Sequence, residues 1–458
     1  MGRFWRSLTL AGLLFAASLL SGCSQPRLTL SPEELYALPT LPAKYTELNT
    51  QLNALLESGA EYAAPTSGAN IQSVQLVDLD GDGREEAVAF FRNSSEEKPL
   101  KIYIFSADGD SYVQTDLIEG SGTSIYSIAY TDLDSDGRLE LLVGWKATAE
   151  LQVLEVYSLR PGGAELLVRR EYVKYITADL NQDQLQELVI LHADEEGDGV
   201  ADYYVWQSDG NLSTQSAARL SITMAELNQQ GRVTQGTLEG ESPALFVTGV
   251  TDDARAVTDI LAVRGGEAAG GGELTNVALS SLTGVSGVVA PFCALYPADI
   301  NGDGLTEVPA AVRRYAPEDE TSFCQWVEWF GYDGAGQPRL ALRTYHSTED
   351  SWYLRLPEAW TERIWIGRSA SLDESAVTFS LLEDGRAGTP FLRITAITGS
   401  NRETRAVRGN RFLLGRQGET IYTGELLEAN ETWQHGMSAD EVREAFSLVA
   451  AEWSAGDY

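Results

Sequence analysis

Cysteine, histidine and lysine are scarce in this chain of 458 residues. It contains only three cysteines and three histidines, and they form no Cys-His cluster that could hold zinc. Arginine carries most of the positive charge, and the formal net charge is −34. So acidic a chain is repelled by phosphate backbones, which excludes nucleic acid as a partner.

Familiar catalytic motifs are also missing. The sequence contains no nucleophile elbow, no phosphate-binding glycine loop and no zinc signature. The three histidines, His192, His346 and His435, lie far apart and outside any motif. The sequence therefore favours a protein without enzymatic activity and leaves the question open.

Proline is infrequent, with 15 residues, whereas glycine is abundant, with 43. Many glycines in an ordinary globular composition are typical of an all-β chain with many tight turns. Short runs of alternating or continuous apolar residues predict strands, and Asp-Gly pairs predict turns between them. The clearest predicted strands are Leu100–Phe105, Leu151–Leu159, Tyr203–Gln207, Val257–Val263 and Ala376–Leu381.

The N-terminus has the pattern of a secretion signal. Two arginines precede an apolar run, Leu8–Leu20, that is too short to span a bilayer. The run ends in Leu-Ser-Gly-Cys, which resembles the lipobox of bacterial lipoprotein signal peptides. The resemblance implies that residues 1–22 are removed, that Cys23 is lipidated, and that residues 23–42 form a tether. The expected location is the extracytoplasmic face of the cell membrane, with no second transmembrane segment.

Two helices are predicted outside the β region. Apolar residues at helical spacing predict one helix over 43–58, ending at Gly59, with a linker to residue 64. A second helix is predicted within 436–458, where Ser438 caps the helix and Glu441 completes a capping box. Its predicted apolar stripe is Val442, Phe446 and Val449.

An internal repeat organises the region between the helices. Four segments share the order strand, acidic loop, strand, and their loops begin at Asp78, Asp132, Asp179 and Asp299. A period near fifty residues suits a four-stranded propeller blade, and residues 65–435 have room for roughly seven. The long interval before Asp299 is expected to hold one copy without a metal site. Its matching residues are Thr251, Asp253, Arg255 and Asp259, with Arg255 in the place of a ligand.

The loop residues have the chemistry and spacing of calcium ligands. Calcium prefers six to eight hard oxygens, and acids at alternate positions of a tight loop can turn toward one centre. Glycine at position six allows the sharp turn, and the carbonyl at position seven adds an oxygen. The final acid stands at position nine rather than twelve, which excludes an EF-hand. In the first loop the predicted ligands are Asp78, Asp80, Asp82, the Arg84 carbonyl and Glu86.

The other three loops follow the same offsets. The second supplies Asp132, Asp134, Asp136, the Arg138 carbonyl and Glu140. The third supplies Asp179, Asn181, Asp183 and Glu187, but Gln184 replaces the glycine, so this loop ranks weakest. The fourth supplies Asp299, Asn301, Asp303, the Leu305 carbonyl and Glu307. A fifth run is better explained as a solvated turn; it comprises Asp194, Glu196, Asp198, Gly199 and Asp202.

These loops resemble the FG-GAP or VCBS repeats of integrin α-subunit-like β-propellers. With the lipobox and the N-terminal helix, the chain resembles VCBS-repeat lipoproteins of Gram-positive, clostridia-like bacteria. The resemblance implies a seven-bladed propeller with Ca²⁺ in loops on one face. It implies no reaction, because calcium in such loops generally rigidifies the blade.

Two features leave alternatives open. Cys293 and Cys324 are expected either to form a disulfide or to remain as two buried thiols. The tryptophans after residue 320 are expected mainly in the core, and a sugar site is the alternative, with Trp352, Tyr353 and Trp360 as its residues.

The expected function is a membrane-anchored, monomeric binding, adhesion or scaffold module for an extracellular protein or glycan. The alternatives are a polysaccharide-active enzyme on a propeller and a purely structural envelope lipoprotein.

Overall fold

The computed structural model describes residues 43–449 apart from 110, 161, 208, 266–271 and 318. The expected signal segment, Cys23 and the tether lie outside the described residues. The chain is mostly β, as expected, and its strands form six antiparallel sheets. We number these sheets one to six in chain order.

The first four sheets are built from strands that follow one another directly along the chain. The first sheet contains β1 (Glu61–Tyr62), β2 (Val74–Val77), β3 (Glu86–Arg92), β4 (Leu100–Asp108) and β5 (Ser111–Gly120). The second contains β6 (Ser124–Thr131), β7 (Glu140–Lys146), β8 (Gln152–Arg160) and β9 (Gly163–Tyr172). The third contains β10 (Lys174–Ala178), β11 (Glu187–Ala193), β12 (Gly199–Trp206) and β13 (Leu212–Arg219). The fourth contains β14 (Arg232–Leu238), β15 (Ser242–Val250), β16 (Arg255–Arg264), β17 (Glu273–Asn276) and β18 (Val289–Pro291).

The last two sheets have five strands each. The fifth contains β19 (Val308–Ala316), β20 (Asp319–Tyr332), β21 (Pro338–Ser347), β22 (Trp352–Arg355) and β28 (Phe446–Leu448). The sixth contains β23 (Ile364–Ala370), β24 (Glu374–Glu383), β25 (Arg386–Ile397), β26 (Phe412–Gln417) and β27 (Thr420–Leu426). The helices are α3 (Ala43–Glu57), α4 (Met224–Gln230), η1 (Glu358–Trp360), α5 (Arg402–Ala406), α6 (Glu428–Thr432) and α7 (Ala439–Ala445).

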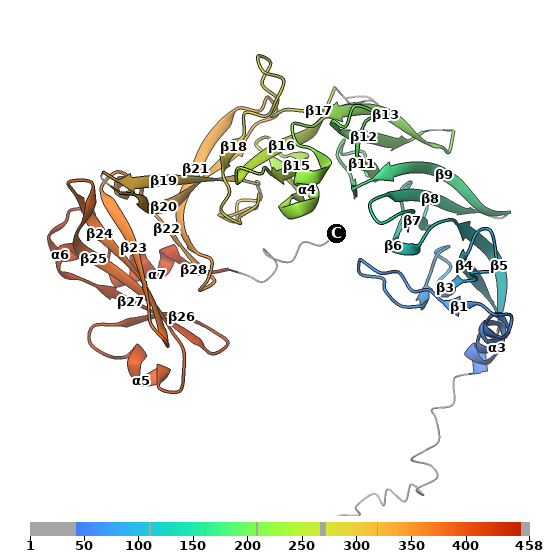
Figure 1. Ribbon diagram of the computed structural model, residues 1–458, viewed down its shortest axis with the longest axis horizontal. Helices are drawn as coiled ribbons and strands as arrows, with labels where there is room; N and C mark the ends of the chain where they lie inside the picture. The colour runs from blue at the N-terminus through green and yellow to red at the C-terminus, as the bar shows by residue number, and fades with distance from the viewer. Residues whose placement is uncertain are drawn as a thin grey trace, which may run out of the picture.

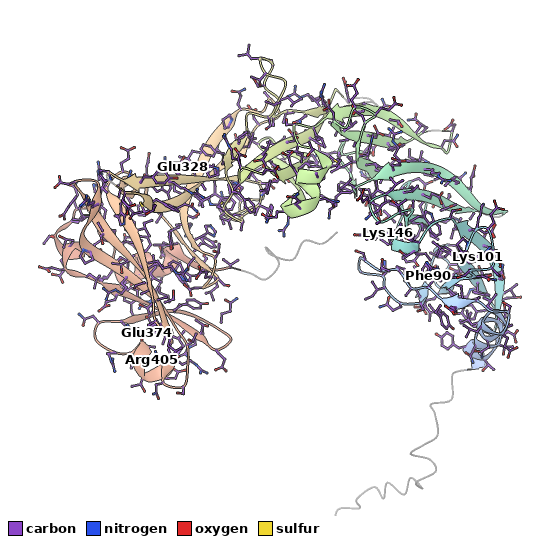
Figure 2. All side chains as sticks on the ribbon, in the orientation of Figure 1. Phe90, Lys101, Lys146, Glu328, Glu374 and Arg405 are labelled. Carbon is purple, nitrogen blue, oxygen red and sulfur yellow. The ribbon has the colours of Figure 1, made fainter. Side chains whose placement is uncertain are left out.

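The sheets follow one another along an open arc, and the first and sixth lie at opposite ends of it (Figure 1). Figure 2 labels Phe90 and Lys101 near one end and Glu374 and Arg405 near the other. Seven blades closing a ring are therefore not confirmed. Strands in the C-terminal half are longer, up to the 14 residues of β20, so this half uses more chain per sheet and the described chain forms six sheets.

Each pair of neighbouring sheets is held by one apolar cluster. Leu141 and Ile102 pack between the first and second sheets, and Val189 and Leu245 pack between the third and fourth. The largest cluster, centred on Trp360, joins the fifth and sixth sheets. The stacking of sheet faces along the arc is propeller-like, and burial of this apolar surface is the main stabilising term.

Helix α3 covers the outer face of the first sheet. Leu48 and Leu52 are buried against Ala87, Ala89 and Phe91 of β3. Burying each leucine contributes about 1.5–3 kcal/mol. The helix thus shields the sheet face at the end of the arc from water.

None of the helices in the described part of the chain is long and apolar enough to cross a membrane.

The C-terminal helix is shorter than the sequence predicts. The capping box is present: the Ser438 hydroxyl accepts from the Glu441 N–H, and the Glu441 carboxylate accepts from the Ser438 N–H. Val442 is buried as expected, but the helix ends at Ala445. Phe446 begins β28 instead, because pairing with β22 satisfies its backbone groups and buries its ring.

Candidate metal-binding loops

The four acidic loops occupy equivalent places in four sheets. Residues 78–86 connect β2 to β3, 132–140 connect β6 to β7, and 179–187 connect β10 to β11. Residues 299–307 precede β19 and are closed by a bridge between Ala298 and Glu307. We call them the first to fourth acidic loops, and we number their positions one to nine.

One hydrogen-bond pattern recurs in all four loops. The Oδ2 of the position-one aspartate accepts from the N–H at position six at 2.9–3.0 Å. The Oδ1 of the position-five aspartate accepts from the N–H at position seven at 2.8–2.9 Å. These bonds hold each aspartate in place at the turn, so the four loops have the same shape.

The glutamate at position nine forms the floor of each loop. Its Oε2 accepts from the N–H of position two, at 2.8–3.2 Å. All four glutamates, Glu86, Glu140, Glu187 and Glu307, are at most 5% exposed. Burial raises the pKa of Glu86, and it raises the pKa of the other three to about 7. None of the four forms an ion pair with a lysine or arginine of the described residues, so hydrogen bonds alone stabilise the charge when the carboxyl is ionised.

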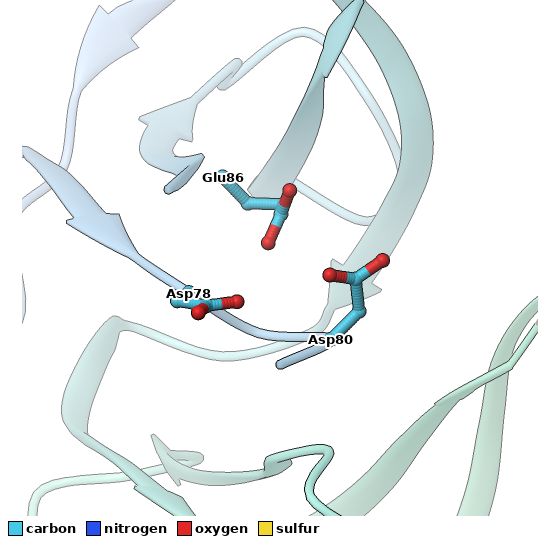
Figure 3. A group of neighbouring side chains, drawn as sticks. All are labelled: Asp78, Asp80 and Glu86. Atoms are coloured by element: carbon cyan, nitrogen blue, oxygen red, sulfur yellow. The ribbon is translucent and has the colours of Figure 1, made fainter. Parts of the chain in front are cut away.

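Carboxylate oxygens converge in three of the loops. Asp78, Asp80 and Glu86 each offer an oxygen within 4.8 Å of the others in the first loop (Figure 3). Asp82 is not in this group, because its Oδ2 is paired with Arg84 at 2.6 Å. The converging acids of the second loop are Asp132, Asp134 and Asp136, and those of the third are Asp179, Asp183 and Glu187.

Asparagine replaces the position-three aspartate in the third and fourth loops. The Asn301 Nδ2 donates to Asp303 Oδ2 at 2.9 Å and to Glu307 Oε1 at 3.4 Å. Asn181 makes the same contact with Asp183 at 3.1 Å. The side-chain amide therefore bridges the acids of these loops, whereas its carbonyl oxygen can serve a cation only after the amide turns.

Backbone conformation separates the third loop from the others. Positions four and six have positive φ in every loop, and two of the loops have glycine at both positions. The third loop has Gln182 at φ 63° and Gln184 at φ 74°. Side chains with a Cβ are strained in this left-handed region. The structure thus gives a physical basis for ranking this loop weakest.

The loops are also bonded to one another. The N–H of position eight donates to the carbonyl of position two in the preceding loop: Leu139 to Leu79 at 2.9 Å, and Gln186 to Leu133 at 3.1 Å. The Ser135 hydroxyl adds a bond to the Gln184 carbonyl at 2.9 Å. The sequence could not indicate this ladder, because its donors and acceptors are mostly backbone groups that every residue carries.

The copy expected to lack a metal site is placed differently from the prediction. Residues 251–254 connect β15 to β16, which are the second and third strands of the fourth sheet. The equivalent of the acidic loops is the short turn between β14 and β15, with Gly240 at φ 90°. Asp259 is fully buried in β16 and accepts from Ser221 and Asn276. The expected alignment of these residues with the ligands is therefore wrong.

The fifth acidic run divides into two parts. Asp194, Glu196 and Asp198 converge in the turn between β11 and β12. Asp198 is paired with the Arg219 guanidinium. Asp202 lies apart from this turn, buried in β12, where its Oδ2 lies 2.9 Å from both His192 and Arg170. It cannot complete a loop with the other three acids.

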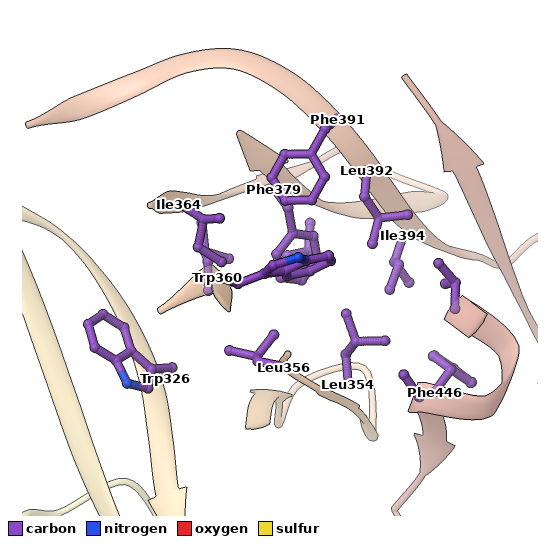
Figure 4. Packing of buried hydrophobic residues seen from close by; sticks show 14 of the residues in the cluster. Trp326, Leu354, Leu356, Trp360, Ile364, Phe379, Phe391, Leu392, Ile394 and Phe446 are labelled. Carbon is purple, nitrogen blue, oxygen red and sulfur yellow. The ribbon is translucent and has the colours of Figure 1, made fainter. Parts of the chain in front are cut away.

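The predicted aromatic sugar site is not formed. Trp352, Tyr353 and Trp360 are at most 7% exposed, and Trp360 packs beneath Phe391 in the core (Figure 4). Because their rings are buried, they offer no platform for a ligand.

The two cysteines are free thiols in different apolar clusters, Cys293 beside Ile300 and Cys324 beside Trp326. Cys324 is buried and Cys293 is half-buried, so the structure contains two free thiols, of which only one is buried as expected.

The donor set of the loops fits a hard divalent cation. Carboxylate and backbone carbonyl oxygens are the ligands that Ca²⁺ prefers, and it binds them in a flexible geometry that a turn can supply. The loops contain no sulfur or imidazole ligand. A cation would also compensate the buried position-nine glutamate. The first and second loops fit best, because all their side-chain donors are carboxylates.

Comparison with known proteins supports the repeat in the first two loops. Residues 78–143 match the FG-GAP-like repeat family. No curated protein sequence matches the chain. A crystal structure of a protein from Lactobacillus plantarum is 12% identical and covers 71% of this chain and 85% of its own, with a TM-score of 0.24.

Two other structures are comparably distant. A GH43 β-1,3-galactosidase with galactodeoxynojirimycin is 9% identical over 61% of this chain and 96% of its own, with a TM-score of 0.21. AofleA from Arthrobotrys oligospora is 8% identical over 80% of this chain and 96% of its own, with a TM-score of 0.23. At these TM-scores the structures support no conclusion about function. Residues 78–143, which contain the first two acidic loops, are thus similar to FG-GAP-like repeats.

Proposed function

We propose that this protein is a calcium-stabilised binding module of the cell surface, anchored through a lipid on Cys23. Its acidic loops take Ca²⁺, which stiffens the stacked sheets. The stiffened arc presents its loops and turns to an extracellular protein or glycan. FG-GAP repeats often bind Ca²⁺, and residues 78–143 resemble that family.

The observation that carries the proposal is the repeated burial of the position-nine glutamate. Four times, a carboxylate at most 5% exposed lies at the base of a loop of aspartates without a cationic partner among the described residues. Desolvation of such a charge costs several kcal/mol unless it is protonated or compensated. A divalent cation held by the loop supplies that compensation at neutral pH.

Calorimetric melting of the protein in Ca²⁺, in Mg²⁺ and in EDTA tests the calcium function. We expect Ca²⁺ to raise the melting temperature well above the value in EDTA, because it binds only the folded loops. Mg²⁺ should have a smaller effect, since it demands a tighter octahedral shell. Identical melting in the three conditions would contradict the proposal.

Cell fractionation tests the anchor separately. Replacement of Cys23 with alanine should remove the lipid attachment and move the protein from the membrane fraction to the soluble fraction. A variant that remains with the membrane would contradict lipid anchoring at this residue.

A further inference from the structure

A polar cavity of about 350 Å³ lies where turns of the fifth and sixth sheets meet. Four chain segments line it: the β21–β22 turn, the β23–β24 turn, the end of β25, and the β26–β27 hairpin. These segments lie near Glu374, toward the C-terminal end of the arc (Figure 2). The volume is at the lower end of the range for small-molecule sites, about 300–1,000 Å³.

Hydroxyl groups dominate the lining. The hydroxyl-bearing residues are Ser351, Ser371, Ser375, Thr398, Thr420 and Tyr422. Gln417 adds a side-chain amide. Four of the hydroxyls already donate to oxygens of the protein, namely those of Ser371, Ser375, Thr398 and Tyr422. These four can accept from a polyhydroxylated ligand, and the remaining hydroxyls and the amide can also donate to it.

The carboxylates beside the cavity are already compensated. Arg368 pairs with Glu349 at 2.5 Å and with Asp350 at 3.3 Å. Arg411 pairs with Glu374 at 3.1 Å and holds the pKa of that carboxyl below its usual range. Asp373 also lines the cavity, and its Oδ2 lies 3.9 Å from Arg405. Each of the four lining carboxylates thus has an arginine within 4 Å behind the lining, which disfavours both a metal ion and an organic cation as the ligand.

Hydrogen bonds fix the position of the Asp350 carboxylate at the cavity. The Asp350 Oδ2 accepts from Ser347 and from Ser375, each at 2.8 Å, and the Tyr422 hydroxyl donates to the Asp350 carbonyl at 2.8 Å. Its Oδ1 receives no hydrogen bond from any residue that the structure describes. The side chain is only 14% exposed, so this oxygen is a fixed, nearly buried acceptor at the cavity.

Leu372 adds an apolar contact beside the polar lining. Its side chain is 97% exposed at the tip of the β23–β24 turn, which lines the cavity. A single exposed leucine is ordinary on a protein surface, so its place beside the cavity supports a ligand only together with the polar lining. A sugar ring presents both hydroxyl edges and apolar C–H faces, so it can use the hydroxyl lining, the Asp350 acceptor and Leu372 together.

We propose that this cavity binds the end of a neutral saccharide. The inference deepens the proposed binding function by naming the ligand class and its site. The site is formed by residues 349–422 and includes no part of the acidic loops.

Titration of the full-length protein, purified in a sugar-free detergent, tests the site. The probes are cellotriose, maltotriose and triacetylchitotriose, with trigalacturonic acid and spermidine as charged controls. We expect at least one neutral trisaccharide to bind and both charged controls to fail. Binding of none of the three neutral sugars, or binding of spermidine or trigalacturonic acid alone, would overturn the inference.

Two variants and one control locate the binding. Asp350→Asn should weaken the affinity at least about tenfold, because it removes a carboxylate acceptor from a nearly buried site. Leu372→Ala, at an exposed tip that supports no packing, should weaken it severalfold. Glu362→Gln, on an exposed surface outside the cavity, should leave it unchanged.

The two proposals fail independently. Sugar binding that is unaffected by both Asp350→Asn and Leu372→Ala would overturn the assignment to this cavity. Loss of calcium stabilisation with sugar binding intact would contradict only the calcium function. Calcium stabilisation without binding of any neutral sugar would contradict only the saccharide site.

Discussion

The main-chain N–H of Leu139 donates to the carbonyl oxygen of Leu79 at 2.9 Å, which joins the second acidic loop to the first. The two loops also touch elsewhere. A Cβ built on Gly81 would lie 2.4 Å from the Gly137 carbonyl oxygen. Order in one loop is therefore coupled to order in the next.

Replacing Gly81 with alanine should separate the first two loops. The residue has φ 73°, so alanine is strained there, and the added methyl group also clashes with the neighbouring loop. Gly83 has φ 84° and open space around it, so Gly83→Ala shows the strain alone. We expect Gly83→Ala to cost about 1–2 kcal/mol of unfolding free energy and Gly81→Ala about 1–3 kcal/mol more. Urea unfolding measures both, and equal values would show that the loops do not constrain each other.

Removal of one acid from each of the first two loops should remove most of the calcium stabilisation. Asp80 and Asp134 both stand at position three and belong to the converging acids. The double variant Asp80→Ala and Asp134→Ala should melt at nearly the same temperature in Ca²⁺ and in EDTA. Asp209→Ala, in an exposed turn outside the loops, is the matched control and should retain the full calcium response. An undiminished response in the double variant would show that these loops are not the calcium sites.

The third loop should become more stable when its strain is relieved. Gln184 has φ 74° where the other loops have glycine. We expect Gln184→Gly to raise the free energy of unfolding by about 1 kcal/mol, as measured in urea. Gln186→Gly is the control: Gln186 lacks a positive φ, so the added chain freedom should destabilise by about 0.5–1 kcal/mol. Destabilisation by Gln184→Gly would mean that its side chain makes contacts worth more than the strain.

Protonation of His346 should oppose folding in acid. Its ring stacks on Tyr353 with centroids 5.0 Å apart, and burial lowers its pKa to about 4. Unfolding raises this pKa toward 6.5, so the unfolded chain binds the proton more tightly. The stabilising contribution of the neutral ring is therefore lost as the pH falls below about 6.5, by about 2 kcal/mol between pH 7 and pH 5. The raised pKa values of Glu140, Glu187 and Glu307 act in the opposite direction over the same range, so the total stability, measured by urea titrations in EDTA, does not report this loss by itself.

A variant without the titrating ring isolates this effect. His346→Phe keeps an aromatic ring beside Tyr353 and cannot be protonated. The difference in stability between this variant and the parent protein should shift by about 2 kcal/mol in favour of the variant between pH 7 and pH 5. A constant difference across this range would show that protonation of His346 does not affect stability.

Local patterns predicted much of the molecule. The acidic loops, the flanking strands and the capping box at Ser438 depend on neighbouring residues, and the structure contains all of them. Helix α3 also follows the predicted apolar spacing. Such features are fixed by the local conformational preferences of the chain, which a single sequence displays.

The features that sequence reasoning missed depend on distant contacts. The repeat period predicted a closed ring. Closure requires contact between the first and last sheets, and a count of repeats carries no information about that contact. The saccharide cavity joins turns that lie as much as seventy residues apart and belong to no repeat. The prediction for Thr251 was wrong for another reason. A sequence shows that an acidic turn lies between two strands, but it does not show which pair of strands in the sheet the turn connects.

Strand β28 affects the order in which the chain can fold. It pairs with β22, although the whole sixth sheet separates the two in sequence. The first four sheets need only strands that are close in sequence, so they can form before the C-terminal residues are available. The fifth sheet must wait, with the free edge of β22 unpaired, until residues 446–448 arrive. A chain halted before those residues would therefore leave the N-terminal sheets folded and the C-terminal pair of sheets open to proteases.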